Sequence, residues 1–311
     1  MSDGSESCYL IVGSESLIGD QLRRELLHRN HHVAGTSRRS DRQPDLHLLD
    51  LGRLDPGAPL SADLRAFVVG QRPVVVFLAG VTRFQQCEQD RTGTFVINVT
   101  NSLAVLRSVL AAGCFTIFVS SSAVFSGLRP FPTEVDATDP TTEYGRQKAT
   151  VESILTNFAL KTGNTDRLAI VRPTKVLPDR DGLVANWVLA LRGGENIGPF
   201  HDLILSPVSV SFVVRGLVRL SSERRAGVFH FSGVEDVSYA MFAYRLAETL
   251  GAPVGLIEPV AAPRHDPNDP FPRFASLAMS ETSLRIGLQP QQLTQTISDV
   301  LTKDLTAGVT Y

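Results

Sequence analysis

The chain has 311 residues, enough for one large domain or two modest domains with hydrophobic cores. Its apolar content of 43% and charged content of 20% are ordinary for a globular protein, and its net charge of −2 argues against a surface for nucleic acid or anionic membranes. The polar start, the short apolar runs and the three cysteines without CxxC spacing predict a cytoplasmic protein with reduced thiols and neither a signal peptide nor a membrane span.

The first predicted elements are a short apolar strand, Cys8–Val12, a glycine-containing loop over residues 13–19 and an amphipathic helix. In this order of elements, the loop commonly binds a dinucleotide phosphate. Gly13 permits the tight turn and Gly19 allows close packing, while Ser16 replaces the middle glycine of the usual pattern and can donate to a phosphate. An ordinary strand–turn–helix connection is the alternative. The predicted contacts are Gly13, Ser16, Leu17, Ile18 and Gly19.

The end of the second predicted strand, His32–Ser37, indicates which dinucleotide binds. NAD-binding folds usually carry an acid there, which accepts hydrogen bonds from the ribose hydroxyls. This chain has Ser37 followed by Arg38 and Arg39 instead. Guanidinium groups suit a phosphate, so these three residues predict NADP. NAD is the alternative if the arginines are an ordinary solvated pair.

Two further apolar runs, 46–49 and 74–80, predict strands of a parallel sheet buried on both faces. Asp50, after the first run, could accept a hydrogen bond from an adenine amino group while Leu51 packs on the adenine ring. The alternative is that Asp50 is an ordinary β-turn aspartate. The second run ends in Ala79 and Gly80, which are small enough to let a cofactor lie against the backbone. The predicted cofactor contacts here are Asp50, Leu51, Ala79 and Gly80.

The clearest chemistry lies on a predicted helix over residues 142–162, where Tyr144 and Lys148 are four apart and share one face. A free tyrosine is a poor acid–base catalyst because its pKa is near 10, and a neighbouring cation lowers that pKa. Only four of the chain's 30 Lys and Arg residues are lysines. Arginine would serve an ordinary surface pair just as well, so a lysine at this position favours a chemical role. Ser121, after a predicted strand at 115–119, is a candidate to hold a carbonyl beside Tyr144. A solvated helix face is the alternative.

The alternation of strands and helices continues through a sixth strand at 167–171 and predicts an α/β fold with a doubly wound parallel sheet, the Rossmann architecture. We expect residues 1–176 to form a dinucleotide-binding domain, to which 208–235 returns. We expect residues 177–311 to form a smaller α+β substrate-binding domain. Its most distinct element is a helix, Tyr239–Leu250, which Ser238 caps and Gly251 ends.

This ordered set of motifs resembles the extended short-chain dehydrogenase/reductase family, and within it the dTDP-4-dehydrorhamnose reductase branch with its nucleotide-sugar-binding relatives. The resemblance covers nearly the whole chain, from the loop 13–19 through Asn98 and the Tyr–Lys pair to residues 227–233. It implies an NADP-dependent reductase of a keto group on a nucleotide sugar, and a homodimer. Tyr144 would protonate the carbonyl oxygen, Lys148 would lower the tyrosine pKa and bind the nicotinamide ribose, and Ser121 would orient the carbonyl.

Two alternatives stay open within this resemblance. A nucleotide-sugar 4-epimerase uses the same three groups but retains NAD tightly, and a non-catalytic NADP-binding subunit serves a partner enzyme, as the regulatory subunit of methionine adenosyltransferase does. A 4,6-dehydratase is not expected, because such enzymes carry Asp-Glu where this chain has Ser122 and Ala123. The spacing of the seven histidines predicts no metal site.

Overall fold

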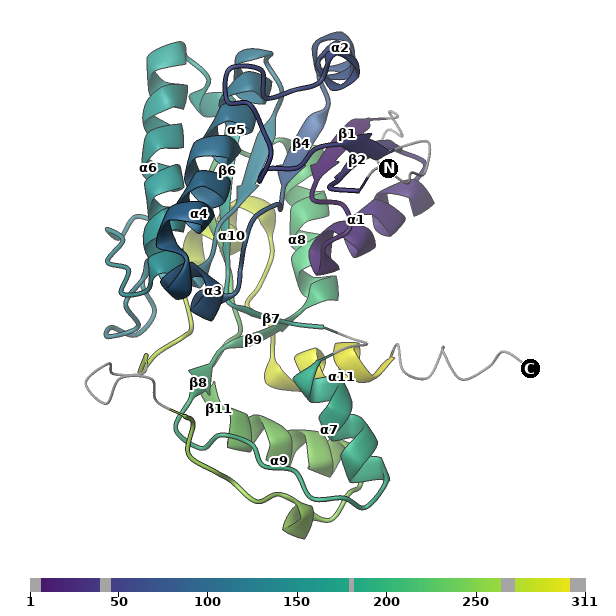
Figure 1. Ribbon diagram of the computed structural model, residues 1–311. Coiled ribbons are helices and arrows are strands. Elements are labelled where there is room, and N and C mark those ends of the chain that lie inside the picture. The colour runs from purple at the N-terminus through teal and green to yellow at the C-terminus, as the bar shows by residue number, and fades with distance from the viewer. Residues whose placement is uncertain (1–6, 40–45, 179–181, 264–271, 303–311) are drawn as a thin grey trace. The chain divides into compact units, whose positions relative to one another are not determined.

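The computed structural model describes residues 7–39, 46–178, 182–263 and 272–302 (Figure 1). Its main feature is a seven-stranded sheet in the order β10-β6-β5-β4-β1-β2-β3. The pairs from β6 to β3 are parallel, with Leu10 of β1 between Ala34 of β2 and Val75 of β4. The predicted doubly wound α/β sheet is therefore confirmed. Its strands are β1 (Cys8–Val12), β2 (His32–Ser37), β3 (Leu46–Leu48), β4 (Val74–Phe77), β5 (Thr116–Val119), β6 (Leu168–Pro173) and β10 (Gly227–Phe231).

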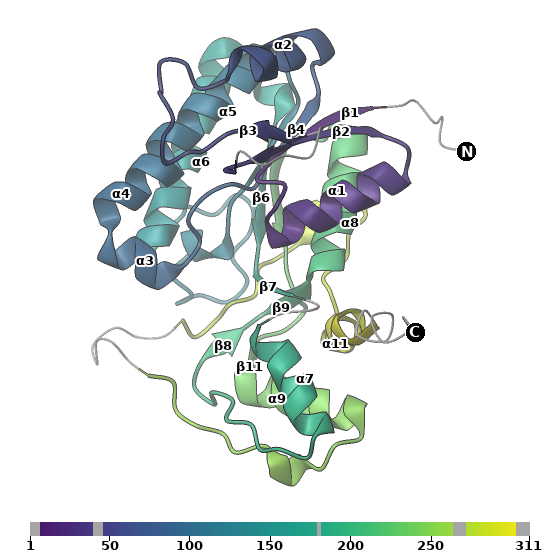
Figure 2. The ribbon, with the colours of Figure 1, turned by 45° about the vertical axis from the view of Figure 1, so that its right-hand side comes forward.

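Helices cover both faces of this sheet, which is why the central strands are apolar on both sides. Figures 1 and 2 show α1 and α8 on one face and α4, α5 and α6 on the other. On the first face, the Tyr9 hydroxyl lies 3.4 Å from Ser221 Oγ of α8. On the second face, Leu10 shares a hydrophobic core with Leu106 of α5 and Leu155 of α6. The helices are α1 (Leu17–His28), α2 (Ala62–Gln71), α3 (Phe84–Gln89), α4 (Arg91–Phe95), α5 (Ser102–Ala111), α6 (Glu143–Thr162) and α8 (Val210–Glu223).

A π-helical segment, Val96–Asn101, lies between α4 and α5. Ser102 Oγ donates to the Ile97 carbonyl oxygen across this segment at 2.9 Å. The whole stretch Arg91–Ala111 is long and apolar enough to cross a membrane by length and composition, a point that the short apolar runs of the sequence did not reveal. A little over half of it, 56% of its most apolar window, is buried. Core helices pass the same test, so this is weak support for a membrane span.

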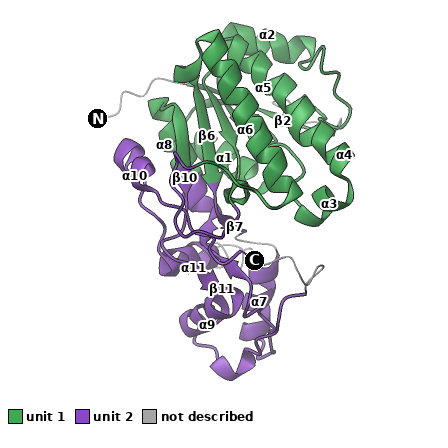
Figure 3. Cartoon of the chain, turned by 90° about the vertical axis from the view of Figure 1, so that its left-hand side faces the viewer, with its two compact units in different colours: residues 1–125, 137–172, 214–229 green, residues 126–136, 173–213, 230–311 purple. Residues whose placement is uncertain are grey.

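The chain divides into two compact units (Figure 3). Unit 1 contains residues 1–125, 137–172 and 214–229, and unit 2 contains 126–136, 173–213 and 230–311. The short segment 126–136 thus groups with unit 2, although the sequence analysis assigned it to the first domain. Within the range of unit 2, residues 179–181 and 264–271 lie outside the described residues.

Unit 2 has its own hydrophobic core, in which Trp187, Phe242 and Ile297 are buried. Ser238 Oγ accepts from the Met241 amide at 3.1 Å and Gly251 ends the helix in a left-handed conformation, so both predicted caps are confirmed. Short strand pairs accompany the helices. The elements are β7 (Lys175–Leu177) paired with β9 (Pro207–Ser209), β8 (Ile204–Leu205) paired with β11 (Val237–Ser238), and the helices α7 (Leu183–Arg192), α9 (Tyr239–Leu250), α10 (Ser280–Ile286) and α11 (Leu293–Thr302).

Candidate functional site

The loop between β1 and α1 has the backbone geometry that a phosphate-binding turn requires. Gly13 has φ of +89°, and an added Cβ would lie 2.9 Å from the Ala79 amide nitrogen. A Cβ on Gly19 would overlap the Gly13 carbonyl oxygen, so both glycines are required for space. Ser16 Oγ accepts from the Gly19 amide at 3.1 Å and caps the 12-residue helix α1. The first amide groups of α1, those of Leu17 and Ile18 included, lie at a helix N-terminus, where backbone N–H groups can bind an anion.

Three side-chain hydrogen bonds join this loop to the end of β2. The Gly13 amide donates to Thr36 Oγ1 at 3.0 Å, and Ser14 Oγ donates to the Thr36 carbonyl oxygen at 2.9 Å. Ser37 Oγ donates to Glu15 Oε2 at 2.5 Å. The strand itself ends without an acid, as the sequence shows, but a carboxylate reaches its end from the neighbouring loop. Sequence reasoning missed Glu15 because only the fold brings it to Ser37.

Asp50 and Leu51, the predicted adenine contacts, lie in the turn that follows β3. Leu51 is only 4% exposed, and its carbonyl oxygen accepts from Asn101 Nδ2 at 2.6 Å. Its side chain packs in the core of unit 1, and its contact with an adenine ring stays a prediction. Asp50 Oδ1 accepts from the Gly52 amide at 2.9 Å, which is the β-turn alternative.

The small residues after β4 are held by Asn98 of the π-helical segment. Gly80 has φ of +148°, and an added Cβ would lie 2.9 Å from Asn98 Oδ1. The same oxygen accepts from the Val81 amide at 2.7 Å, while Asn98 Nδ2 donates to the Val81 carbonyl oxygen and to Gln147 Oε1 at 2.9 and 2.7 Å. The segment after β4, which contains Ala79 and Gly80, is thereby linked to α6 through Val81.

Unit 1 brings Ser121, Tyr144 and Lys148 together. Ser121 precedes a 3₁₀ turn, Ser122–Val124, where its Oγ accepts from the Ala123 amide at 3.1 Å, and its side chain is hydrogen-bonded to Tyr144. Lys148 Nζ lies 5.8 Å from the centre of the Tyr144 ring and donates to the Val119 carbonyl oxygen at 3.0 Å. Both α6 side chains are buried. The three groups predicted to act on a carbonyl are therefore neighbours.

Burial sets the protonation of this pair. It raises the pKa of Tyr144 well above its ordinary value, and the hydrogen bond with Ser121 lowers that pKa by less. The pKa of Tyr144 therefore lies above its ordinary value, whereas the sequence led us to expect a lowering by Lys148. Burial also lowers the pKa of Lys148 to about 8, against the attraction of the Glu152 carboxylate, which raises it. At neutral pH, Tyr144 thus holds its proton.

A buried ion pair lies beside these groups. Arg172 Nη2 of β6 is 2.6 Å from Glu152 Oε2 of α6, and both side chains are 6% exposed. Ser120 Oγ donates to Glu152 Oε1, and the Arg172 guanidinium lies 5.1 Å from the centre of the Phe125 ring. The pair ties the end of β6 to the helix that carries Tyr144.

Gly145 keeps α6 close to the turn that carries Ser121. A Cβ at this position would overlap the Ala123 carbonyl oxygen and lie 3.0 Å from Pro140 Cβ. We therefore expect Gly145→Ala to lower the free energy of unfolding by about 1–3 kcal/mol, because backbone must move to admit the methyl group. Gly70→Ala on α2 is the matched control: nothing lies within 4 Å of its added Cβ, and helix propensity predicts a gain of up to about 1 kcal/mol. Urea unfolding measures both; equal effects would contradict the close approach.

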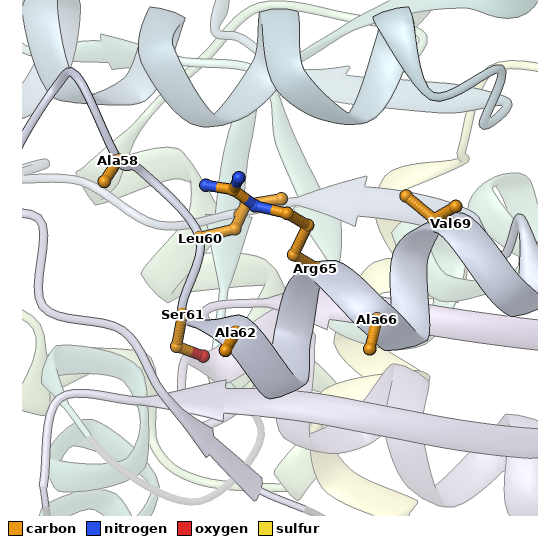
Figure 4. A pocket seen from close by; sticks show the side chains of 7 residues that line it. All are labelled: Ala58, Leu60, Ser61, Ala62, Arg65, Ala66 and Val69. Carbon is orange, nitrogen blue, oxygen red and sulfur yellow. The ribbon is translucent and has the colours of Figure 1, made fainter.

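An open hollow elsewhere on unit 1 contains none of these residues (Figure 4). Ser61 and Arg65 are its polar side chains, and Ser61 Oγ already caps α2 by accepting from Leu64. Over the described parts of the chain, no three His, Cys, Asp or Glu side chains are grouped to hold a metal ion.

The chain is similar to known proteins in sequence and in fold. The family described as RmlD substrate binding domain matches residues 8–306. The dTDP-4-dehydrorhamnose reductase of Sinorhizobium fredii is 26% identical over 211 residues, covering 65% of this chain and 69% of the relative. The methionine adenosyltransferase 2 subunit beta of Xenopus tropicalis is 24% identical over 264 residues, covering 81% and 74%. The structure of dTDP-4-dehydrorhamnose reductase from Bacillus anthracis in complex with NADP superposes with a TM-score of 0.80 at 20% identity, covering 97% of this chain and 100% of that one.

Proposed function

Because the chain belongs to the RmlD substrate binding domain family, we propose that it is an NADP-dependent reductase of a keto group on a nucleotide-activated sugar. The observation that carries this proposal is the grouping of Ser121, Tyr144 and Lys148 at the carboxyl-terminal side of β5, in the unit that also holds the glycine loop. Ligands of doubly wound sheets bind at the carboxyl ends of the strands. We propose unit 1 as the dinucleotide-binding unit and unit 2 as the substrate-binding unit.

Each group has a role that its chemistry allows. The loop 13–19 would hold the pyrophosphate of NADP, with Arg38 and Arg39 toward its 2′-phosphate. The bound cofactor supplies the hydride. Tyr144, which is protonated at neutral pH, donates its proton to the carbonyl oxygen, and Ser121 orients that oxygen. Lys148 hydrogen-bonds the nicotinamide ribose, and its charge stabilises the phenolate that Tyr144 becomes.

The test is oxidation of NADPH in the presence of a panel of 4-keto nucleotide sugars, with products identified by mass spectrometry. We expect an alcohol product from at least one substrate. We expect no 4,6-dehydration of a nucleotide hexose, because Ser122 and Ala123 offer no carboxylate. Turnover by dehydration would contradict the proposed reaction.

The pKa of Lys148, lowered to about 8, gives the reaction an alkaline limit. The ammonium is present below this pH and is lost above it, so we expect kcat/KM for keto reduction to fall as pH rises through about 8. Lys161→Gln is the control, because Lys161 is the exposed lysine of the same helix and its loss should leave the limit in place. A pH–rate profile that stays flat to pH 10 would contradict the role of Lys148.

A second candidate is a non-catalytic NADP-binding subunit of another enzyme. The observation in its favour is that a relative named as a subunit of methionine adenosyltransferase covers 81% of this chain. No turnover across the sugar panel, together with a stable complex with another enzyme, would favour it. Tightly bound NAD in the purified protein would instead favour a nucleotide-sugar 4-epimerase. In either case we propose a cytoplasmic protein, with a homodimer as the expected assembly.

A further inference from the structure

The carboxylate of Glu15 lies at the end of β2, although Glu15 belongs to the loop between β1 and α1. Its Oε2 accepts from Ser37 Oγ at 2.5 Å, and Ser37 Oγ in turn accepts from the Arg39 amide at 3.0 Å. The hydroxyl proton of Ser37 is thus committed to Glu15. A carboxylate has about four acceptor positions, so the exposed Glu15 has acceptor capacity left after this bond.

The backbone on either side of this contact is fixed. Ser14, the residue before Glu15, is buried, and its Oγ donates to the Thr36 carbonyl oxygen. Gly35 of β2 leaves the space for it, because an added Cβ there would lie 2.5 Å from Ser14 Oγ. Ser16, the residue after Glu15, caps α1. The loop therefore has little freedom to carry the Glu15 backbone away from β2.

The end of the second strand is where doubly wound folds recognise the adenosine ribose. An acid there accepts from the ribose 2′-hydroxyl of NAD, whereas a guanidinium accommodates the 2′-phosphate of NADP. This chain places both kinds of group at that end. Glu15 would accept from a hydroxyl and repel a phosphate, and the exposed Arg38 and Arg39 would attract a phosphate. Among the described residues, no ion pair engages either arginine.

We propose that Glu15 determines the choice between the two dinucleotides: it retains affinity for NAD and limits the preference for NADP that Arg38 and Arg39 create. This inference rests on the proposed dinucleotide site. It differs from the sequence expectation, in which the strand end held no acid and the arginines alone decided. The protein therefore binds both dinucleotides, with opposing charges setting the ratio of their affinities.

The experiment measures the dissociation constants of NADP⁺ and NAD⁺ by isothermal titration calorimetry at low salt, for the wild type and for Glu15→Gln. We expect the variant to raise the preference for NADP⁺ over NAD⁺ by about tenfold or more, since it removes one charge close to a phosphate dianion. Asp20→Asn is the matched control: it removes an exposed carboxylate of α1 that pairs with Arg24 at 2.7 Å, and it should leave the preference within about threefold.

The second arm of the experiment removes the two arginines. Arg38→Ala with Arg39→Ala should move the preference toward NAD⁺, opposite to Glu15→Gln. A wild type that binds dinucleotide with a preference that Glu15→Gln leaves unchanged, or moves toward NAD⁺, would overturn the inference and leave the proposed function standing. A wild type that binds neither dinucleotide would overturn both. Circular dichroism of each variant confirms that the fold is retained.

Discussion

Tyr144→Phe should reduce kcat for keto reduction by about 10²–10⁴-fold, because general acid catalysis contributes this much and the phenyl ring has no proton to donate. The ring is buried and its hydroxyl is hydrogen-bonded to Ser121, so the variant loses one oxygen from a packed site. Steady-state kinetics with NADPH and the best substrate of the panel measure the loss. Binding of NADPH should be nearly unchanged, since the tyrosine is assigned to the carbonyl and not to the cofactor.

The matched control is Tyr244→Phe on α9, where the tyrosine is 36% exposed. It should leave kcat within about twofold, as surface substitutions away from special features usually do little. If Tyr144→Phe retains more than half of the wild-type kcat while Tyr244→Phe behaves the same, Tyr144 is not the proton donor. The reductase would then need another acid.

Glu152→Ala should lower the free energy of unfolding by about 3–5 kcal/mol, because it leaves the Arg172 guanidinium buried without its carboxylate. The Ser120 hydroxyl loses its acceptor in the same change. Chemical unfolding monitored by circular dichroism measures the effect. The double variant with Glu152→Ala and Arg172→Met should lose less than the sum of the two single changes, because it removes the buried guanidinium together with its carboxylate.

The control for this prediction is Glu25→Ala on α1. Glu25 pairs with Arg29, four residues later in the chain, at 2.7 Å, but the two side chains are 38% and 49% exposed. Surface pairs of this kind contribute at most about 1 kcal/mol. A loss for Glu152→Ala as small as that for Glu25→Ala would show that Arg172 finds water or another partner.

The parts of unit 1 that the sequence predicted are those with strong local signals. β2 was predicted with both of its limits, since an apolar run follows two histidines and ends at a polar pair. The helix that carries Tyr144 begins after Thr142, whose Oγ1 accepts from the Gly145 amide at 3.1 Å, and ends at Gly163 in a left-handed conformation. Helix caps of this type can be predicted from the residue types alone.

The parts that the sequence did not predict depend on contacts between distant segments. The residues around the π-helical segment are ordinary helix formers, so the sequence does not mark it. What distinguishes the segment is Asn98, which hydrogen-bonds Val81 and Gln147 in distant parts of the chain. The burial of Leu51 in the core of unit 1 was not predicted either. Glu15 lies 22 residues from Ser37, and no local pattern joins them. In unit 2, the strands have only two or three residues, too few to show the alternation of apolar and polar residues that predicts a strand.

The most direct test of the account is a crystal structure of the protein with NADP⁺. We expect the pyrophosphate on the amide groups of the loop 13–19. The nicotinamide ribose should lie at hydrogen-bond distance, about 3 Å, from Lys148 Nζ, and the nicotinamide should lie beside Tyr144. A dinucleotide bound elsewhere, or one whose nicotinamide lies away from Tyr144 and Lys148, would contradict it.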